Sequence, residues 1–341
     1  MAAPVHFRHG GNDHQLPWGS RFSAPREEGF RDTPASELAA IVREIETGRN
    51  WRDVLAARFA AAKPWLHQIV TSPLRTAFFQ SVLRSNIGPI LDIGSGWGQI
   101  ARPLAREYYV VALEPVAERL AFIAAAARQE GVHERLAFVE SDYFEIAFES
   151  RFAAICAIGV LEWAGAFQSG ADAQQRQRDF LRKIRSELTP GGQLVLGIEN
   201  RLGLKYLLGA PDDHIGVPLI ACLPAALAAP RWRAASGQTL RSFTYSQAEL
   251  CQHLRDAGFT NIEFFAAFPD YKLPTAIVPF GEGGEELNAW LCTHTPPADH
   301  NGYDGSPLPP DLVAALTGHY RTFAEEGVAH AFVPSFFVRA S

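Results

Sequence analysis

Between residues 88 and 200, short apolar runs alternate with longer stretches in which apolar residues recur every three or four positions. The runs are PILDIG, YVVALEP, LAFVESD, FAAICAIGVLE and GGQLVLGIEN. Runs of this kind are typical of strands that are buried on both faces, and the stretches between them predict helices over residues 99–107, 117–130 and 174–188. The alternation predicts an α/β domain with a largely parallel sheet.

A different pattern precedes the predicted sheet. Residues 1–34 are rich in Gly, Pro, His and Arg without periodicity, so they predict an arm whose degree of order the sequence does not decide. Residues 35–86 turn helical, and four apolar residues share the first helical face: Leu38, Ile41, Val42 and Ile45. We therefore expect an arm and a helical cap over residues 1–86, followed by one domain over residues 87–341.

The C-terminal third predicts one more helix and two strands. Ser246 can cap the start of the helix and Gly258 its end, and the strand NIEFFAAF follows. Residues 281–312 are dominated by turn-forming residues, which favours a long excursion. We expect an insertion over residues 281–334 before a final strand in PSFFVRAS.

Composition narrows the function classes. The 341 residues are 47% hydrophobic and carry a formal charge of −6, which excludes overall disorder and any overall field that attracts nucleic acid or an anionic membrane. Four cysteines without a Cys-x-x-Cys pair favour neither a disulfide framework nor a zinc cluster. Prolines interrupt the longest apolar stretch, residues 215–230, so we expect it to line a pocket and not to span a membrane. We therefore expect a cytoplasmic protein, and a homodimer is compatible with these features.

A glycine-rich loop follows the first strand of the predicted sheet. It contains Gly94, Ser95, Gly96 and Gly98, and Asp92 stands two places before it. A dinucleotide-binding loop would place its third glycine three positions after the second, and an acid here would repel a phosphate. The acid can instead accept hydrogen bonds from an ammonium group. A tight turn alone would also use glycines, but the acid favours a ligand with a cationic end.

The next two strands of the predicted sheet also end in acids. Glu114 and Pro115 end the second strand, where an acid can accept two ribose hydroxyls. Asp142 and Tyr143 follow the third strand, where the carboxylate can accept from an adenine amine. Three acids at successive strand ends describe a nucleoside that carries an amino acid and no phosphate, which is S-adenosylmethionine (SAM).

These motifs, in the order LDIGSGWG, ALEP, ESD, IGVLEWAG and LTPGGQLVLGIEN, resemble the core of class I SAM-dependent methyltransferases over residues 88–200. The resemblance implies a Rossmann-like sheet of seven strands with the last one antiparallel. It also implies SAM as cofactor, S-adenosylhomocysteine (SAH) as product, and Gly159 of IGVLEWAG among the cofactor-binding residues. ENRLGLKYLLGAPDDHIG, PDYKLPT and PSFFVRAS resemble a bacterial subgroup that modifies surface polysaccharides.

Methyl transfer to a hydroxyl needs alignment, exclusion of water and removal of a proton. His214 is the candidate base because the neighbouring carboxylates, Asp212 and Asp213, can raise its basicity, and Glu162 is a second candidate. The alternatives are a loop histidine that bonds the backbone and a divalent cation bound by Asp-Asp-His. The cluster lacks further ligands at a recognisable spacing, so we expect no metal. Glu162 can equally close a turn.

Candidate acceptor-binding residues follow the later strands. Glu199 and Asn200 end the fifth strand, Tyr271 follows the sixth, and Arg231 belongs to a basic segment that can hold an anionic sugar. Each can also be structural or solvated. The leading hypothesis is methylation of a sugar or glycan hydroxyl. Alternatives are an N- or O-methyltransferase of a natural product or peptide and a non-catalytic SAM-binding scaffold. The fourth strand lacks the Asn/Asp-Pro-Pro-aromatic turn that grips a flipped base.

Overall fold

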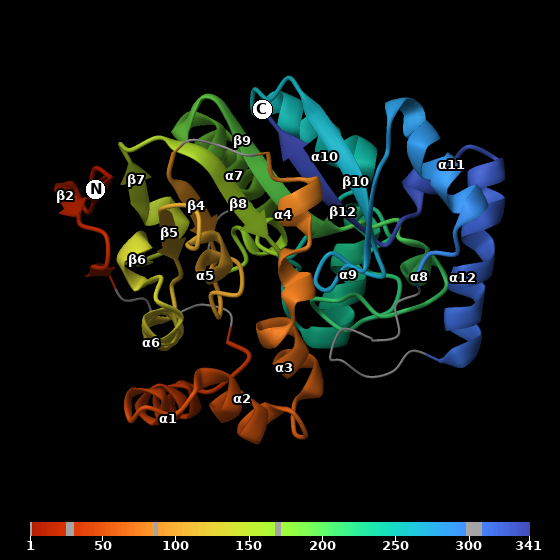
Figure 1. Ribbon diagram of the computed structural model, residues 1–341. Coiled ribbons are helices and arrows are strands. Elements are labelled where there is room, and N and C mark those ends of the chain that lie inside the picture. Colours follow the sequence, from red (N-terminus) through yellow and green to blue (C-terminus); the bar gives the residue numbers. More distant parts are fainter. Residues whose placement is uncertain (1, 25–30, 85–87, 168–171, 298–308) are drawn as a thin grey trace. The chain divides into compact units, whose positions relative to one another are not determined.

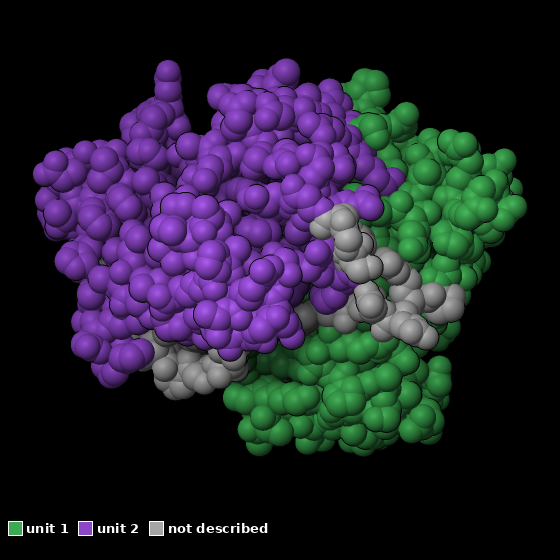
Figure 2. Space-filling model, turned by 180° about the vertical axis from the view of Figure 1, so that it is seen from behind, with its two compact units in different colours: residues 1–76, 85–158, 186–194 green, residues 77–84, 159–185, 195–341 purple. Residues whose placement is uncertain are grey.

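The computed structural model describes the chain except for residues 1, 25–30, 85–87, 168–171 and 298–308 (Figure 1). The chain forms two compact units from interleaved segments (Figure 2). Unit 1 comprises residues 1–76, 85–158 and 186–194, and unit 2 comprises residues 77–84, 159–185 and 195–341. The junction expected at residue 86 and part of the expected insertion lie outside the described residues, and the division into a cap and a catalytic domain stays a prediction.

Unit 1 holds the parallel strands that the apolar runs predict. They are β4 (Ile90–Ile93), β5 (Val110–Leu113), β6 (Leu136–Glu140) and β8 (Phe152–Ile158). The order is β8-β4-β5-β6, all pairs are parallel, and the short strand β3 (Arg21–Ser23) adds a parallel edge beside β6. Nearly every residue of the four central strands is buried, which explains why they read as continuous apolar runs.

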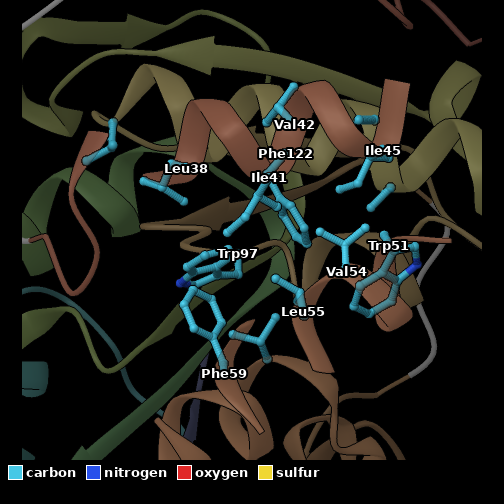
Figure 3. Close-up of a cluster of buried hydrophobic side chains, with 14 residues drawn as sticks. Leu38, Ile41, Val42, Ile45, Trp51, Val54, Leu55, Phe59, Trp97 and Phe122 are labelled. Atoms are coloured by element: carbon cyan, nitrogen blue, oxygen red, sulfur yellow. The ribbon is translucent and has the colours of Figure 1, made fainter. Parts of the chain in front are cut away.

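Helices pack into a second core of unit 1. The cap predicted before the sheet contains α1 (Ala35–Glu46), α2 (Trp51–Phe59), α3 (Pro64–Thr71) and the 3-10 turn η1 (Pro73–Thr76). The four residues predicted to share one face of α1 are all buried (Figure 3). They meet α6 (Ala117–Glu130) and Trp97, whose ring centroid lies 5.8 Å from that of Phe59 and 5.0 Å from that of Phe122. The glycine-rich loop is therefore anchored, through Trp97, in the same core as the cap helices.

The N-terminal arm contains a hairpin that the composition did not predict. Strand β1 (Val5–His9) pairs antiparallel with β2 (Asn12–Leu16) and with β7 (Ile146–Phe148). Gly10 and Gly11 form the turn with φ values of 56° and 81°. Positive φ at both central residues is the requirement of the common two-residue hairpin turn.

Unit 2 holds the strands that complete the sheet pattern. Strand β9 (Leu188–Glu199) begins in unit 1 and ends in unit 2, where the order is β11-β10-β12-β9. The final strand β12 (Ser335–Ala340) is antiparallel to β10 (Ile262–Phe268), as the resemblance implies. All seven core strands are present, and β11 (Ala276–Pro279) adds an edge strand beside β10 that the sequence did not predict.

The helices of unit 2 correct one expectation. They are α4 (Phe78–Ser81), α7 (Ala173–Glu187), α8 (Leu204–Leu207), α9 (Ala225–Ser236), α10 (Gln247–Asp256), α11 (Glu285–Thr293) and α12 (Pro310–Glu325). The irregular excursion expected over residues 281–312 is wrong, because α11 buries Leu287 and Leu291 one turn apart and α12 begins at Pro310. In unit 1, the helix expected over residues 99–107 is only α5 (Ala101–Leu104).

The cap predicted at Ser246 is confirmed. Ser246 caps α10 in a capping box with Glu249. None of the helices in the described part of the chain is long and apolar enough to cross a membrane.

Candidate functional site

The glycine-rich loop of unit 1 turns sharply away from β4. Gly94, Gly96 and Gly98 have φ values of 66°, 55° and 70°, a region that side chains rarely adopt. A Cβ atom at Gly98 would lie 2.8 Å from Ile123, so the loop can pass close to α6 only with glycine there. The N–H of Ser95 donates to Leu113 O at 3.0 Å, which ties the loop to β5.

Asp92 supplies a buried acceptor at the start of this loop. Asp92 is 1% exposed, and its Oδ2 has no hydrogen-bond partner among the described residues. Burial raises the pKa of Asp92 to about 7. An unpartnered buried carboxylate oxygen is costly, and a ligand that donates a charged N–H group removes that cost. The contact of Asp92 with the amino group of SAM, which the sequence predicts, stays a prediction.

Glu114 is held by the loop itself. Its Oε2 accepts from Gly96 N at 2.9 Å, and its Oε1 accepts from Val116 N at 3.1 Å. Burial raises the pKa of Glu114, and the guanidinium of Arg119, 3.5 Å from Oε1, opposes that rise. Glu114 therefore lies at the end of β5 beside the glycine loop, and Pro115 follows it, partly exposed. Their contact with the ribose stays a prediction.

The residues after β6 take part in local bonds. Asp142 Oδ1 accepts from Phe144 N at 2.7 Å and so caps the 3-10 turn η3 (Tyr143–Glu145). The buried hydroxyl of Tyr143 donates to Glu187 Oε2 at 2.6 Å. Asp142 thus stands at the strand end where the sequence placed it, while the Tyr143 hydroxyl is bound inside unit 1. Their contact with the adenine also stays a prediction.

Gly159, the remaining cofactor candidate, belongs to unit 2. Its φ is 72°, and a Cβ atom there would lie 2.7 Å from the Tyr271 hydroxyl. Its N–H donates to Gly197 O at 2.9 Å. The close approach of Tyr271 requires glycine at this turn after β8.

Unit 2 brings the imidazole ring of His214 together with two other predicted site residues, Glu162 and Glu199. His214 Nε2 lies 3.5 Å from Glu162 Oε1 and 3.4 Å from Glu199 Oε2. Its Nδ1 lies 3.5 Å from Asp212 Oδ1, and Trp163 packs against the ring edge to face at a centroid distance of 5.2 Å. The His214 side chain is 5% exposed and both glutamates are fully buried. The residues that meet here are 15 to 52 positions apart in the sequence, counted between Glu162, Glu199 and His214.

The charges in this cluster shift one another's pKa. Burial alone would lower the pKa of His214, but Glu199, Asp212 and Glu162 together raise it well above its usual 6.5. Burial raises the pKa of Glu162, and the hydrogen bond from His214 opposes this rise. Burial would also raise the pKa of Glu199, but Lys272 and His214 hold it well below its usual range. The carboxylates around the ring therefore favour the imidazolium form of His214.

Asp213 faces lysines and not the imidazole. Its carboxylate accepts from Lys205 Nζ at 2.9 Å, from Lys272 Nζ at 3.2 Å and from the Tyr206 hydroxyl at 3.0 Å. Burial would raise the pKa of Asp213, but the two lysines lower it to about 2. The sequence predicted that Asp212 and Asp213 both raise the basicity of His214, whereas the acid beside Nδ1 is Asp212 and Asp213 pairs with the lysines. The sequence did not predict Lys205 as a partner of Asp213, although both residues stand in the short motif GLKYLLGAPDDH.

The three other acceptor candidates differ in their surroundings. Asn200 is buried, and its Nδ2 donates to Ala331 O and Val333 O, both at 2.9 Å, which ties β9 to the chain before β12. Tyr271 is also buried, and its backbone N–H donates to Ser335 Oγ at 2.8 Å. Arg231 is exposed on α9. Their acceptor contacts stay predictions.

A cavity of about 180 Å³ opens beside His214 within unit 2. One part of its wall is apolar and includes Ile220, Leu223 and Phe243. The other is polar and includes Gln174, Arg201, Asp212, His214, Ser242, Thr244, Tyr245 and Glu249. The apolar stretch around residue 220 therefore lines a pocket, as its sequence predicted.

Among the described residues, two groups have ligand atoms spaced closely enough to hold a metal ion. Glu162, Glu199 and His214 form one group, and their ligand atoms lie within 4.8 Å of one another. Glu199, Asp213 and Asp270 form the other, but the Lys272 ammonium contacts all three of these acids. The expectation that no metal takes part stays a prediction.

The glycine-rich loop lies in a region that matches a known protein family. A family model described as a methyltransferase domain matches residues 90–192, which run from β4 into β9. No curated protein sequence matches the chain. This match identifies residues 90–192 as a methyltransferase domain, so the chain is an enzyme and SAM is its cofactor.

Solved structures of methyltransferases and of related enzymes are similar in fold. The CcbJ methyltransferase of Streptomyces caelestis is 18% identical over 59% of this chain and 82% of its own, with a TM-score of 0.41. A possible histamine N-methyltransferase of Thermotoga maritima is 14% identical over 84% of this chain and 97% of its own, with a TM-score of 0.41. A cyclopropane synthase of Mycobacterium tuberculosis is 16% identical over 78% of this chain and 82% of its own, with a TM-score of 0.43.

Proposed function

We propose that this enzyme methylates a hydroxyl group of a sugar or glycan, with His214 as the group that takes the hydroxyl proton. The observation that carries the proposal is the position of His214 on the cavity wall of unit 2, with carboxylates on both ring nitrogens. When bound, SAM supplies an electrophilic methyl group, so the protein has to orient the acceptor, exclude water and accept a proton.

The carboxylates around His214 decide when the ring can act as a base. Because they favour the imidazolium, a proton taken from the acceptor is stabilised on the ring. The same effect means that the resting ring must first lose its own proton. Turnover should therefore rise with pH through a value well above 6.5, the usual pKa of histidine.

The composition of the cavity wall supports a carbohydrate. A sugar ring presents hydroxyl groups at its edge and C–H groups on its faces, and the cavity offers both kinds of partner. Arg201 spans the polar wall, where it donates to Glu249 Oε2 at 2.7 Å and to the carbonyls of Cys222 and Leu223. Small-molecule sites combine apolar walls with a few placed polar groups in this way.

A second candidate, methylation of an amine, is favoured by the charge of the cluster. The described residues place four carboxylates, those of Glu162, Glu199, Asp212 and Asp213, beside three cationic groups, those of Lys205, His214 and Lys272. An excess of buried carboxylates attracts a cationic acceptor. An amine also needs less help from a base than a hydroxyl does.

Labelled methyl transfer distinguishes these functions. Purified protein would be incubated with methyl-labelled SAM and matched panels of neutral sugars, uronic acids, nucleotide sugars, amino sugars and small amines, and SAH release would be measured alongside. We expect label on hydroxyl oxygens of the sugar panels. Label on nitrogen alone would replace the proposal by N-methylation, and SAM binding without turnover in any panel would favour a scaffold.

A chelator arm in the same assay tests the metal-free expectation. Turnover should be unchanged when the protein is dialysed against EDTA. A loss of turnover that one divalent cation restores would mean that Glu162, Glu199 and His214 hold a metal.

The four cysteines are all unpaired, which is consistent with the reducing cytoplasm as the place of this reaction.

A further inference from the structure

We infer that Asp32, in the segment before α1, is a positioning residue of the cofactor site and acts on Glu114 through Arg119. The inference rests on the proposed role of Glu114 in cofactor binding. Asp32, Arg119 and Glu114 all belong to unit 1. None of the sequence motifs that point to SAM contains Asp32 or Arg119.

Arg119 lies between two carboxylates. It belongs to the first turn of α6, and its Nη2 lies 2.8 Å from Asp32 Oδ2 while its Nη1 lies 3.5 Å from Glu114 Oε1. The side chains of Arg119 and Glu114 are 6% and 3% exposed, and that of Asp32 is 22% exposed. A guanidinium presents its N–H groups in a rigid fork, so the bond to Asp32 fixes the direction of the edge that faces Glu114.

The partners of Glu114 leave one of its oxygens available. Oε1 faces Val116 N and the Arg119 guanidinium. Oε2 accepts from Gly96 N, its one hydrogen-bond donor among the described residues. A carboxylate oxygen has two lone pairs, so Oε2 keeps one for a ligand hydroxyl. Any rotation of the carboxylate away from Arg119 would move that lone pair.

Asp32 also holds the glycine-rich loop. The indole N–H of Trp97 donates to Asp32 Oδ2 at 3.1 Å, and Trp97 stands between Gly96 and Gly98. The same oxygen of Asp32 therefore binds Arg119 of α6 and Trp97 of the loop. Two of the groups that contact Glu114, the Arg119 guanidinium and the N–H of Gly96, therefore belong to segments that this one carboxylate holds.

When one of the carboxylates that contact a buried guanidinium is removed, the position of that guanidinium is disturbed. The substitution Asp32→Asn keeps the volume and an oxygen that can accept from Trp97, but it removes the charge that pairs with Arg119. We therefore expect it to act on Glu114 without unfolding unit 1.

Unit 1 offers a matched control in Glu130. Glu130 Oε1 also accepts from a buried arginine, Arg102 Nη1 at 2.5 Å, and from a tryptophan indole, Trp51 Nε1 at 3.1 Å. It has no contact with Glu114 among the described residues. Glu130→Gln therefore removes the same kind of charge from the same unit without touching the Glu114 carboxylate.

A double-mutant cycle on SAH affinity tests the inference. Calorimetric titration of SAH would compare the full-length wild type, Asp32→Asn, Glu114→Gln, the double variant and Glu130→Gln, with thermal unfolding of each as a check on folding. We expect Asp32→Asn to weaken SAH binding about tenfold, the scale of a hydrogen bond to a charged group. Glu114→Gln should weaken it at least as much, the double variant should match Glu114→Gln, and Glu130→Gln should bind like the wild type.

Three outcomes would overturn it. Unchanged affinity in Asp32→Asn, with Glu114→Gln weakened, would remove Asp32 and leave the role of Glu114 standing. A tenfold loss from Asp32→Asn that persists in the Glu114→Gln background would show that Asp32 acts by another route. Unchanged affinity in Glu114→Gln would contradict the role of Glu114 itself. If Asp32→Asn does not fold, Arg119→Lys replaces it in the cycle, because an ammonium cannot bridge both acids.

Discussion

The glycine-rich loop of unit 1 and the ionic cluster of unit 2 hold buried acids in opposite ways. In the loop, Asp92 keeps an oxygen without a hydrogen-bond partner and its pKa is raised to about 7. In the cluster, Glu199 and Asp213 contact cationic side chains that lower their pKa below the usual range. The loop thus leaves a buried carboxylate oxygen without a partner, which we predict the cationic end of SAM supplies, whereas the cluster is largely compensated by the chain itself.

Removal of an acid from the compensated cluster should give the largest effect. Asp213→Asn removes the buried carboxylate that pairs with Lys205 and Lys272, so we expect the free energy of unfolding to fall by about 3–5 kcal/mol. Urea unfolding at pH 7 measures this. The pKa of about 2 against an ordinary 3.8 also means that the contribution of Asp213 is present above pH 4 and is lost as the pH falls through 2.

The control for Asp213 is an ion pair in the same unit with more solvent around it. Glu263 pairs with Arg339, and its side chain is 44% exposed. Glu263→Gln should cost less than about 1 kcal/mol, as exposed pairs do. Equal losses in the two variants would contradict the view that the cluster around Asp213 is held together by buried charge.

The next effect concerns catalysis. His214→Gln keeps a polar side chain but cannot take a proton, so turnover of an acceptor found in the panels should fall by roughly 100-fold. The rise of the wild-type rate with pH should vanish as well, because the carboxylates no longer act through an imidazole. Turnover and the pH profile would be measured from pH 6 to 10. A variant that keeps both would move the proton transfer to Glu162 or to proximity alone.

A smaller effect is expected on cofactor binding as the pH changes. Asp92 has to be ionised to accept from the ammonium of SAM, and its pKa is about 7. Affinity should therefore fall as the pH drops below 7, by up to about tenfold per pH unit, and should level off above it. Calorimetry of SAH between pH 5.5 and 8 tests the slope. The slope should disappear in Asp92→Asn, and a wild-type affinity that is flat over this range would mean that Asp92 does not meet the ammonium.

The smallest effect serves as a baseline for unit 2. Ser246 accepts from Glu249 N at the start of α10 and completes a capping box. Ser246→Ala should lower the free energy of unfolding by about 1 kcal/mol through the lost cap. Chemical unfolding measures the loss, and SAH affinity should stay at the wild-type value. A change in SAH affinity would show that a small loss of stability in unit 2 also weakens cofactor binding. The cofactor loop of unit 1 would then not be independent of unit 2.

The sequence predicted the parts of the molecule that rest on local patterns. The buried parallel strands, the face of α1 and the Ser246 cap each depend on residues within a few positions of one another. Val5 and Phe7 alternate with polar residues before Gly10 and Gly11, a pattern that also predicts a hairpin. The Gly, Pro, His and Arg content of the arm obscures this pattern. The α11 helix was missed because glycines just before it outweighed its two buried leucines.

The ionic contacts could not be predicted in the same way. Trp97 meets Asp32 across 65 positions and Lys272 meets Glu199 across 73, and no spacing rule links such pairs. Near neighbours misled as well, because Asp212 and Asp213 are adjacent in the sequence but face different cations. Sequence therefore located the acids, and only the folded chain assigned each acid to its partner.

One titration tests the central claim most directly, namely that the loop of unit 1 binds the cofactor and the cluster of unit 2 serves the acceptor. SAH would be titrated at pH 8 into the wild type, Asp92→Asn and His214→Gln, each shown to be folded. We predict that Asp92→Asn weakens binding at least about tenfold, as expected for loss of a charge-assisted hydrogen bond, while His214→Gln binds like the wild type. Full affinity in Asp92→Asn, or an equal loss in His214→Gln, would contradict the account.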